Sequence, residues 1–196
     1  MTGIAAVILA GGKAERLGGI NKALIEIGGR TLLERAQDVV AGCDPLLLAV
    51  GASNFAADGM TTIPDIASNY AGPLAGVAAA VDTLRRSDVG WLLSLAVDTP
   101  FFPADFVARA LPLAATADVV IGCFGAQDYP TNALWRLAAI RGLPEGVRNG
   151  TAAHSLKRLA ASLRSVRMDY AETLADDPFL NANTPEDLAF LRMRKP

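Results

Sequence analysis

Four apolar runs recur along the chain, separated by segments with a helical pattern of polar and apolar residues. The runs cover residues 4–10, 46–50, 91–97 and 119–121. Each is too uniformly apolar for a strand with one face in water, and such runs are typical of strands buried on both faces. We therefore predict a sheet that is covered by helices on both sides.

Helix signals lie between these runs. Thr31 and Glu34 have the spacing of a capping box, and Gly42 follows the last apolar position of that helix. Further helices are expected over residues 74–84 and 103–113, and another begins at Thr184. Because buried strands and helices alternate, we predict an α/β fold with three layers and a mostly parallel sheet.

Length and composition limit the class of protein. A chain of 196 residues fits one domain over residues 1–196. The chain is 52% hydrophobic and 19% charged, with a net charge of -2, which is typical of a globular protein that binds neither nucleic acid nor a membrane.

The cysteines and the apolar runs indicate the cellular compartment of the protein. Cys43 and Cys123 lack CxxC spacing, so we expect free thiols in a reducing compartment. Residues 4–10 are not preceded by Lys or Arg and lead into a polar loop, so we do not expect a signal peptide. Since no apolar run approaches the ~18 to 20 residues of a spanning helix, we expect a cytoplasmic protein.

A glycine-rich loop, LAGGKAERLGGINKAL, follows the first apolar run at residues 9–24. Glycines allow close backbone approach to a ligand and leave N–H groups free for phosphate oxygens. The loop has neither G-x-G-x-x-G nor Walker A spacing. It favours a phosphate site over a simple turn with solvated lysines, because four glycines lie among three cations: Gly11, Gly12, Gly18 and Gly19 with Lys13, Arg16 and Lys22.

Two aspartates follow predicted strands. In parallel sheets, ligands bind at the carboxyl ends of the strands. Asp98 comes directly after residues 91–97, where its carboxylate could hold Mg²⁺ beside phosphates, or could instead cap a helix or form a turn. Asp65 follows Pro64, and a Pro-Asp turn is the stronger alternative there.

Four motifs occur in order over nearly the whole chain: LAGGKAERLGGINKAL, AGPLAGVAAAV, LAVDTPFFPADF and FLNANTPEDL. As a set they resemble the nucleotidyltransferase family that includes molybdenum cofactor guanylyltransferase. The resemblance implies a Rossmann-like nucleotidyltransferase fold. It also implies Mg²⁺-dependent transfer of GMP from GTP to the phosphate of molybdopterin cofactor, with release of pyrophosphate. LAGG resembles the guanylyl branch, whereas the cytidylyl branch tends to read LAAG.

The resemblance also implies roles for single residues. Lys22 would contact the nucleotide phosphates, Asp65 would lie in the guanosine site and Asp98 would bind Mg²⁺. Two positions depart from the family pattern, because Asn21 stands where Asp is frequent and Ala49-Val50-Gly51 lacks a strand-end Asn. The remaining implied positions hold nucleotide or line the acceptor side: Leu9, Ala10, Gly11 and Gly12 for the nucleotide, and Asn181 and Asn183 for the acceptor.

The chemistry fits a chain with one histidine. The attacking phosphate oxygen is already ionised at neutral pH, so no general base is required, and catalysis depends on positioning and charge. With Mg²⁺ on Asp98, Lys22 and Arg16 would neutralise the charge that grows on the leaving pyrophosphate.

An anionic acceptor needs a basic site. Residues 136–167 contain seven Lys or Arg and the single acid Glu145. We predict that this region binds the pterin phosphate or a protein that delivers it. The alternative is a solvated helix face, with Leu156, Leu159, Ala160 and Leu163 turned inward. The candidate acceptor residues are Arg148, His154, Lys157 and Arg158.

Two other functions stay open at this point. One is cytidylyl transfer, or nucleotidyl transfer to a related phosphate acceptor, and the other is a non-catalytic module that binds nucleotide. We expect a monomer that meets cofactor-biosynthesis or molybdoenzyme-maturation proteins transiently.

Overall fold

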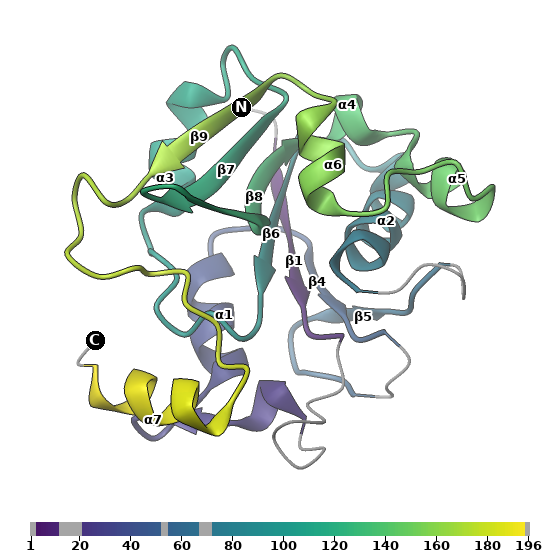
Figure 1. Ribbon diagram of the computed structural model, residues 1–196. Coiled ribbons are helices and arrows are strands. Elements are labelled where there is room, and N and C mark those ends of the chain that lie inside the picture. Colours follow the sequence, from purple (N-terminus) through teal and green to yellow (C-terminus); the bar gives the residue numbers. More distant parts are fainter. Residues whose placement is uncertain (1–2, 12–20, 52–54, 67–71, 195–196) are drawn as a thin grey trace.

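A seven-stranded sheet forms the centre of the molecule (Figure 1). The computed structural model describes residues 3–11, 21–51, 55–66 and 72–194. The strand order is β5-β4-β1-β6-β8-β7-β9, and β8 is antiparallel to both of its neighbours, β6 and β7, while the other pairs are parallel. The strands are β1 (Ile4–Leu9), β4 (Leu46–Ala49), β5 (Thr61–Ile63), β6 (Trp91–Ala96), β7 (Val119–Phe124), β8 (Gln127–Arg136) and β9 (Ser165–Asp169).

Helices cover both faces of this sheet, as the sequence pattern predicts. One hydrophobic cluster unites the sheet with α1 (Leu32–Val40), α3 (Phe106–Leu113) and α7 (Pro185–Met193). A second cluster lies on the opposite face, against α2 (Pro73–Thr83), α4 (Leu137–Ile140), α5 (Leu143–Arg148) and α6 (Leu156–Ala161). The short elements are η2 (Lys22–Leu24), β2 (Glu26–Ile27), β3 (Arg30–Thr31) and η3 (Leu84–Arg86). The prediction of a three-layer, mostly parallel α/β fold is therefore confirmed.

Local capping signals set two of the helix starts. The capping boxes of Thr31 with Glu34 and of Thr184 with Asp187 are both formed. The third helix differs from the prediction, since α3 begins at Phe106 rather than at Pro103. The Pro103 carbonyl accepts a hydrogen bond from the Phe106 N–H at 3.1 Å, so Pro103 lies in a turn before the helix.

Gly76 allows α2 to pack closely on the sheet. A Cβ atom at this position would lie 2.7 Å from Leu9 Cδ2 and 3.0 Å from the Ala49 Cβ. Both neighbours belong to the last residues of their strands, so the first turns of α2 lie beside the carboxyl ends of β1 and β4. Among the described residues, no helix is both long and apolar enough to cross a membrane.

Candidate active site

Four neighbouring strands end at one edge of the sheet, where the first residues of the predicted loop and both predicted carboxylates lie. A Cβ on Gly11, after β1, would lie 3.1 Å from the Gly51 nitrogen, after β4. A Cβ on Gly51 would lie 3.7 Å from Asp65 Oδ2, after β5. On the other side of β1, Asp98 follows β6. The strand order therefore places Asp65, Gly51, Gly11 and Asp98 along a continuous edge.

The close approach at Gly11 and Gly51 depends on glycine. Gly51 has a φ of +61°, which side chains rarely allow, and a Cβ on Gly11 would press against the Gly51 backbone. Leu9 is buried and Ala10 donates its N–H to the Ala49 carbonyl at 2.8 Å, so both fix the start of the loop. Gly12 and Arg16, which the sequence assigns to nucleotide and phosphate contacts, lie outside the described residues.

Lys22 bridges two residues that are distant in sequence. Its Nζ donates to Asp98 Oδ2 at 2.7 Å and to Asn183 Oδ1 at 2.5 Å. The side chains of Lys22 and Asp98 are only 18% and 13% exposed, so this ion pair is shielded from water. Asn21 caps the short helix η2 by accepting the Ala23 N–H at 3.0 Å, which holds Lys22 in place. An aspartate oxygen could accept the same bond, so the departure from the family pattern at Asn21 preserves the local structure.

Asp98 lies in a turn with a fixed backbone. The Ala96 carbonyl accepts bonds from the Thr99 N–H at 3.2 Å and from the Thr99 hydroxyl at 2.5 Å. The Asp98 carbonyl accepts from the Ala182 N–H at 2.9 Å. Asp98 does not cap α3, whose N-cap position is occupied by Asp105. No role is predicted for Thr99 from the sequence, although a role is predicted for its neighbour Asp98 in the same Asp-Thr-Pro motif.

Asp65 lies beside the glycines with its side chain partly buried. Burial raises the pKa of the Asp65 carboxyl above its ordinary value. A carboxyl group in such a setting is a candidate for hydrogen bonding to a ligand at this edge, because a polar partner would offset the desolvation.

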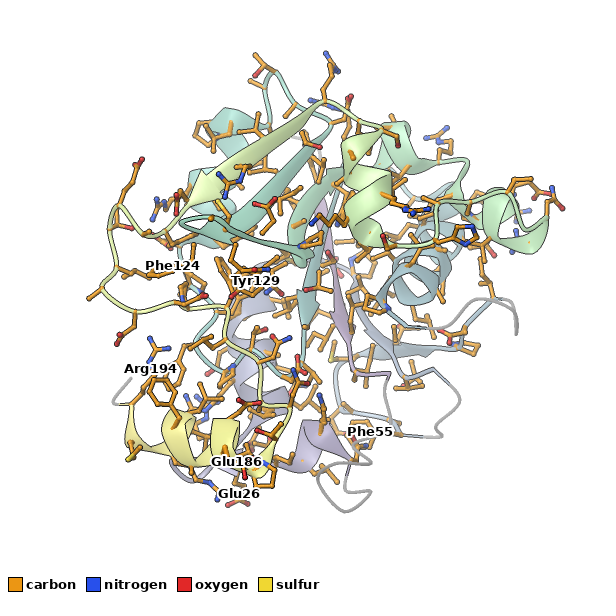
Figure 2. All side chains as sticks on the ribbon, in the orientation of Figure 1. Glu26, Phe55, Phe124, Tyr129, Glu186 and Arg194 are labelled. Atoms are coloured by element: carbon orange, nitrogen blue, oxygen red, sulfur yellow. The ribbon has the colours of Figure 1, made fainter. Side chains whose placement is uncertain are left out.

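The segment before α7 completes the site. Asn183 donates its backbone N–H to Asp187 Oδ2 at 3.0 Å, so the capping box of α7 positions the residue that contacts Lys22. Asn181 Oδ1 is buried and has no hydrogen-bond partner among the described residues. Arg194, labelled in Figure 2, donates to the Asp177 carbonyl at 2.8 Å and stacks 4.7 Å from the Phe101 ring, three residues after Asp98 in the chain. The C-terminal segment is therefore tied to the Asp98 loop at several points.

The predicted basic acceptor residues belong to α5, α6 and the segment between them, on the opposite face of the sheet from α7. Arg148, on α5, forms ion pairs with Asp82 and Glu145, and Asp82 lies near the end of α2 that is distant from the strand ends. Lys157 and Arg158 are exposed on α6, whose Leu156 and Ala160 are buried, as the alternative of a solvated helix face requires. Figure 1 shows α5 and α6 well apart from α7. His154 is exposed in the segment between α5 and α6.

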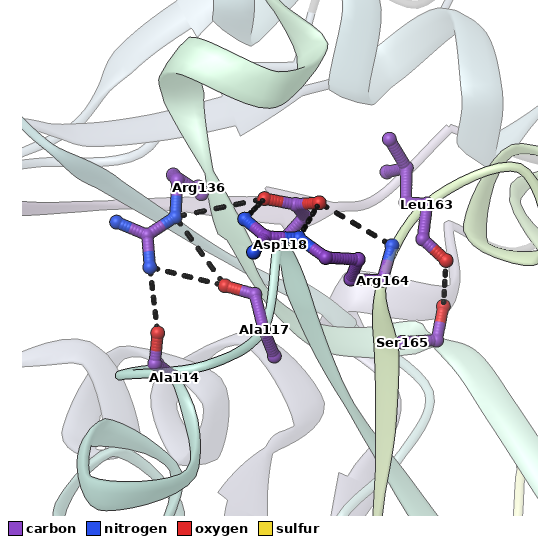
Figure 3. Close-up of polar contacts among 7 residues, drawn as sticks. All are labelled: Ala114, Ala117, Asp118, Arg136, Leu163, Arg164 and Ser165. Carbon is purple, nitrogen blue, oxygen red and sulfur yellow. Dashed lines mark hydrogen bonds and ion pairs between the residues drawn. The ribbon is translucent and has the colours of Figure 1, made fainter.

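Acids from other parts of the fold neutralise much of this basic region. Figure 3 shows Asp118, which precedes β7, between two of the arginines: Arg164 Nη2 donates to Asp118 Oδ1 at 2.7 Å, and Arg136 Nε lies 3.8 Å from the same oxygen. Arg167 pairs with Asp128. In the folded protein, acids from other segments therefore neutralise part of the positive charge of residues 136–167.

Comparison with known proteins shows the family of this chain. Residues 6–167 match the family model described as the MobA-like NTP transferase domain. A protein of Rhodopseudomonas palustris (strain HaA2), named molybdenum cofactor guanylyltransferase, is 37% identical over 203 residues, which cover 97% of this chain and 93% of that protein.

Solved structures share the fold. Molybdopterin-guanine dinucleotide biosynthesis protein A from Archaeoglobus fulgidus superposes with a TM-score of 0.72 at 22% identity, over 96% of each chain. A protein of Mycobacterium tuberculosis H37Rv, solved in complex with manganese, gives a TM-score of 0.68 at 18% identity, over 97% of each chain. The family model covers most of the chain and the Rhodopseudomonas relative nearly all of it, and the chain belongs to the MobA-like nucleotidyltransferase family.

Proposed function

We propose that the chain transfers GMP from GTP to the phosphate of molybdopterin cofactor, forming molybdopterin guanine dinucleotide. In this reaction an oxygen of the cofactor phosphate attacks the α-phosphorus, a new P–O bond forms, and the bond to the β-phosphate breaks to release pyrophosphate. The observation that carries the proposal is the contact of Lys22 with both Asp98 and Asn183 beside the glycine-rich strand end. The names of relatives that match nearly the full length support this substrate pair.

Mg²⁺ is the proposed metal, and the donor atoms at the site fit it. Asp98 Oδ2 and Asn183 Oδ1 already converge on one cation, the Lys22 ammonium, and hard oxygen ligands are those that Mg²⁺ prefers. The manganese complex of a neighbour with the same fold supports a divalent metal in this family. Asp98 would hold Mg²⁺, which would stabilise negative charge on the phosphate oxygens.

The chain's own residues supply binding and charge. Leu9, Ala10, Gly11 and Gly12 would hold the nucleotide, and the two glycines would let the backbone approach it closely. Lys22, with Arg16, would neutralise the pyrophosphate as it leaves. For this purpose the Lys22 ammonium would exchange its contact with Asp98 for one with the phosphates, as a flexible lysine side chain allows.

The two substrates would occupy opposite sides of the β1 end. Asp65, beside Gly51, would accept hydrogen bonds from the guanosine. Asn181 and Asn183 would line the acceptor side, and the unpartnered Asn181 Oδ1 supports a polar ligand there. The exposed residues of α6 would then contact a protein that delivers the cofactor in the cytoplasm.

Pyrophosphate release tests the proposal. We expect turnover with GTP, but not with CTP or ATP, when Mg²⁺ and molybdopterin cofactor are present, and loss of turnover in Asp98→Ala. Turnover with CTP alone would instead establish the cytidylyl reaction. If GTP binds but no nucleotide turns over, the chain is a binding module or acts on another phosphate, and the proposal fails.

A further inference from the structure

Asn132 is a buried polar residue that neither the sequence motifs nor the comparisons single out. Its relative exposure is 0%, and it precedes the apolar residues Ala133, Leu134 and Trp135 of β8. A fully buried amide in the centre of a sheet is unusual, because desolvation of its polar atoms is costly unless they are paired.

The irregular path of β8 explains what Asn132 does. Regular pairing of β8 with β6 ends at Ala133, opposite Ser94. On the other side, Ala133 pairs with Ile121 but the next pair joins Gly122 to Tyr129, so residues 130–132 bulge out of the ladder. Pro130 contributes to this bulge, since it lacks an N–H for pairing. The backbone of β8 therefore does not continue alongside the last residues of β6.

The side chain of Asn132 replaces the missing backbone contact. Its Oδ1 accepts the Ala96 N–H at 3.0 Å. Ala96 is the last residue of β6 and lies two positions before Asp98. The opposite edge of this segment is held by β1, where the Leu9 carbonyl accepts the Val97 N–H at 3.1 Å. The strand end that carries Asp98 is thus held between β1 and the Asn132 amide.

Fold stability alone does not account for the amide. Asn132 Nδ2 is buried and has no partner among the described residues. An apolar side chain would leave the Ala96 N–H unpaired but would remove the unpaired Nδ2. One buried, unsatisfied donor is exchanged for another, so the two costs are comparable. What only the amide provides is a fixed position for Ala96.

From these contacts we infer that Asn132 is a positioning residue for Asp98: by holding the Ala96 N–H it fixes the strand end from which the proposed metal ligand projects. The inference deepens the proposed function and rests on the assignment of Asp98 to the metal. Partners that orient a metal ligand typically contribute about 10 to 100-fold to metal affinity.

Two variants of the same β6–β8 seam test the inference. Asn132→Leu removes the acceptor for Ala96. Ser94→Ala is the matched control, because Ser94 is equally buried and its Oγ accepts from Trp135 Nε1 at 2.8 Å, but Ser94 lies four residues before Asp98 and not at the end of β6. For both variants and the wild type we would measure Mn²⁺ affinity with GTP present, hydrogen exchange of the Ala96 amide, and the thermal unfolding temperature.

We expect Asn132→Leu to weaken Mn²⁺ binding by about 10 to 100-fold and to accelerate exchange at Ala96, with an unfolding temperature no lower than that of Ser94→Ala. Ser94→Ala should keep wild-type Mn²⁺ affinity. The inference is overturned if both variants lose affinity equally, if exchange at Ala96 is unchanged, or if Asn132→Leu alone fails to fold. Absence of Mn²⁺ binding in the wild type would instead refute the metal assignment, and exchange at Ala96 then decides the positioning role by itself.

Discussion

At the scale of single residues, Lys22 depends on two other segments of the chain, because its ammonium contacts the Asp98 carboxylate and the Asn183 amide. We predict that Lys22→Gln lowers kcat for GMP transfer by about 10² to 10³-fold, since it removes one charged contact to the leaving pyrophosphate. Steady-state pyrophosphate release measures this effect. The control is Lys157→Gln, the same change on the exposed face of α6.

The control also tests the predicted acceptor site. Lys157 is exposed on α6, on the opposite face of the sheet from α7, so Lys157→Gln should leave both kcat and the KM for the cofactor unchanged. A raised KM for the cofactor would show that the acceptor does reach α6. That result would contradict the placement of the acceptor at Asn181 and Asn183.

The sequence indicates some of these residues more readily than others. Lys22 and Asp98 stand out because each follows a strong local signal, a glycine-rich loop or a buried strand. The contact between Lys22 and Asn183 spans 161 positions and leaves no local pattern. The same limit applies to the basic region: Glu145 is its only acid along the chain, but Asp82 and Asp118 enter it through tertiary contacts.

At the scale of elements, the capping box of α7 links helix stability to the site. Thr184 and Asp187 cap the helix, and Asp187 Oδ2 also accepts the Asn183 N–H. We predict that Thr184→Ala lowers the free energy of unfolding by about 1 kcal/mol, as the loss of an N-cap does. It should also reduce kcat, because Asn183 loses its fixed position beside Lys22. Urea unfolding and steady-state kinetics measure the two effects.

The capping box of α1 is the control for this prediction. Thr31→Ala removes the same kind of cap, but the bonds of Thr31 are to Glu34 and involve no site residue. The two variants should lose similar stability, while only Thr184→Ala should lose activity. If the two variants have the same kcat, the α7 cap does not affect the activity of the site.

The elements themselves were predictable where a local pattern is strong. β1 and β4 are wholly apolar and β6 is apolar except for Ser94, and the boxes at Thr31 and Thr184 mark helix starts. β8 escaped prediction because it begins with polar residues and Pro130, and its pairing depends on two distant neighbours. The edge strand β9 is largely open to water, and α4, α5 and α6 are too short for helical periodicity.

At the scale of the whole molecule, one carboxylate joins three parts of the fold at the end of the sheet opposite the site. Asp118 precedes β7, Arg136 ends β8 and Arg164 precedes β9 (Figure 3). Arg136 also donates to the Ala114 carbonyl at 2.6 Å, after α3, and stacks 4.3 Å from the Trp91 ring. This network therefore links β7, β8 and β9 to α3 and β6.

The network predicts a specific dependence of stability on pH. Hydrogen bonding from Arg164 lowers the pKa of Asp118 to about 2, below its value of about 3.9 in an unfolded chain. A carboxyl group with a lowered folded-state pKa stabilises the protein fully above the unfolded-state pKa, and this stabilisation is lost as the pH falls from about 4 to about 2. Asp118→Asn should therefore unfold at a lower temperature than the wild type at pH 7, and this difference in unfolding temperature should shrink as the pH falls from about 4 to about 2.

Asp88→Asn is the control, since Asp88 is exposed and has no ion pair among the described residues. The unfolding temperature of Asp88→Asn should match that of the wild type at every pH. If the difference in unfolding temperature between Asp118→Asn and the wild type is unchanged at pH 2, then packing around Asp118, rather than its charge, stabilises this end of the sheet.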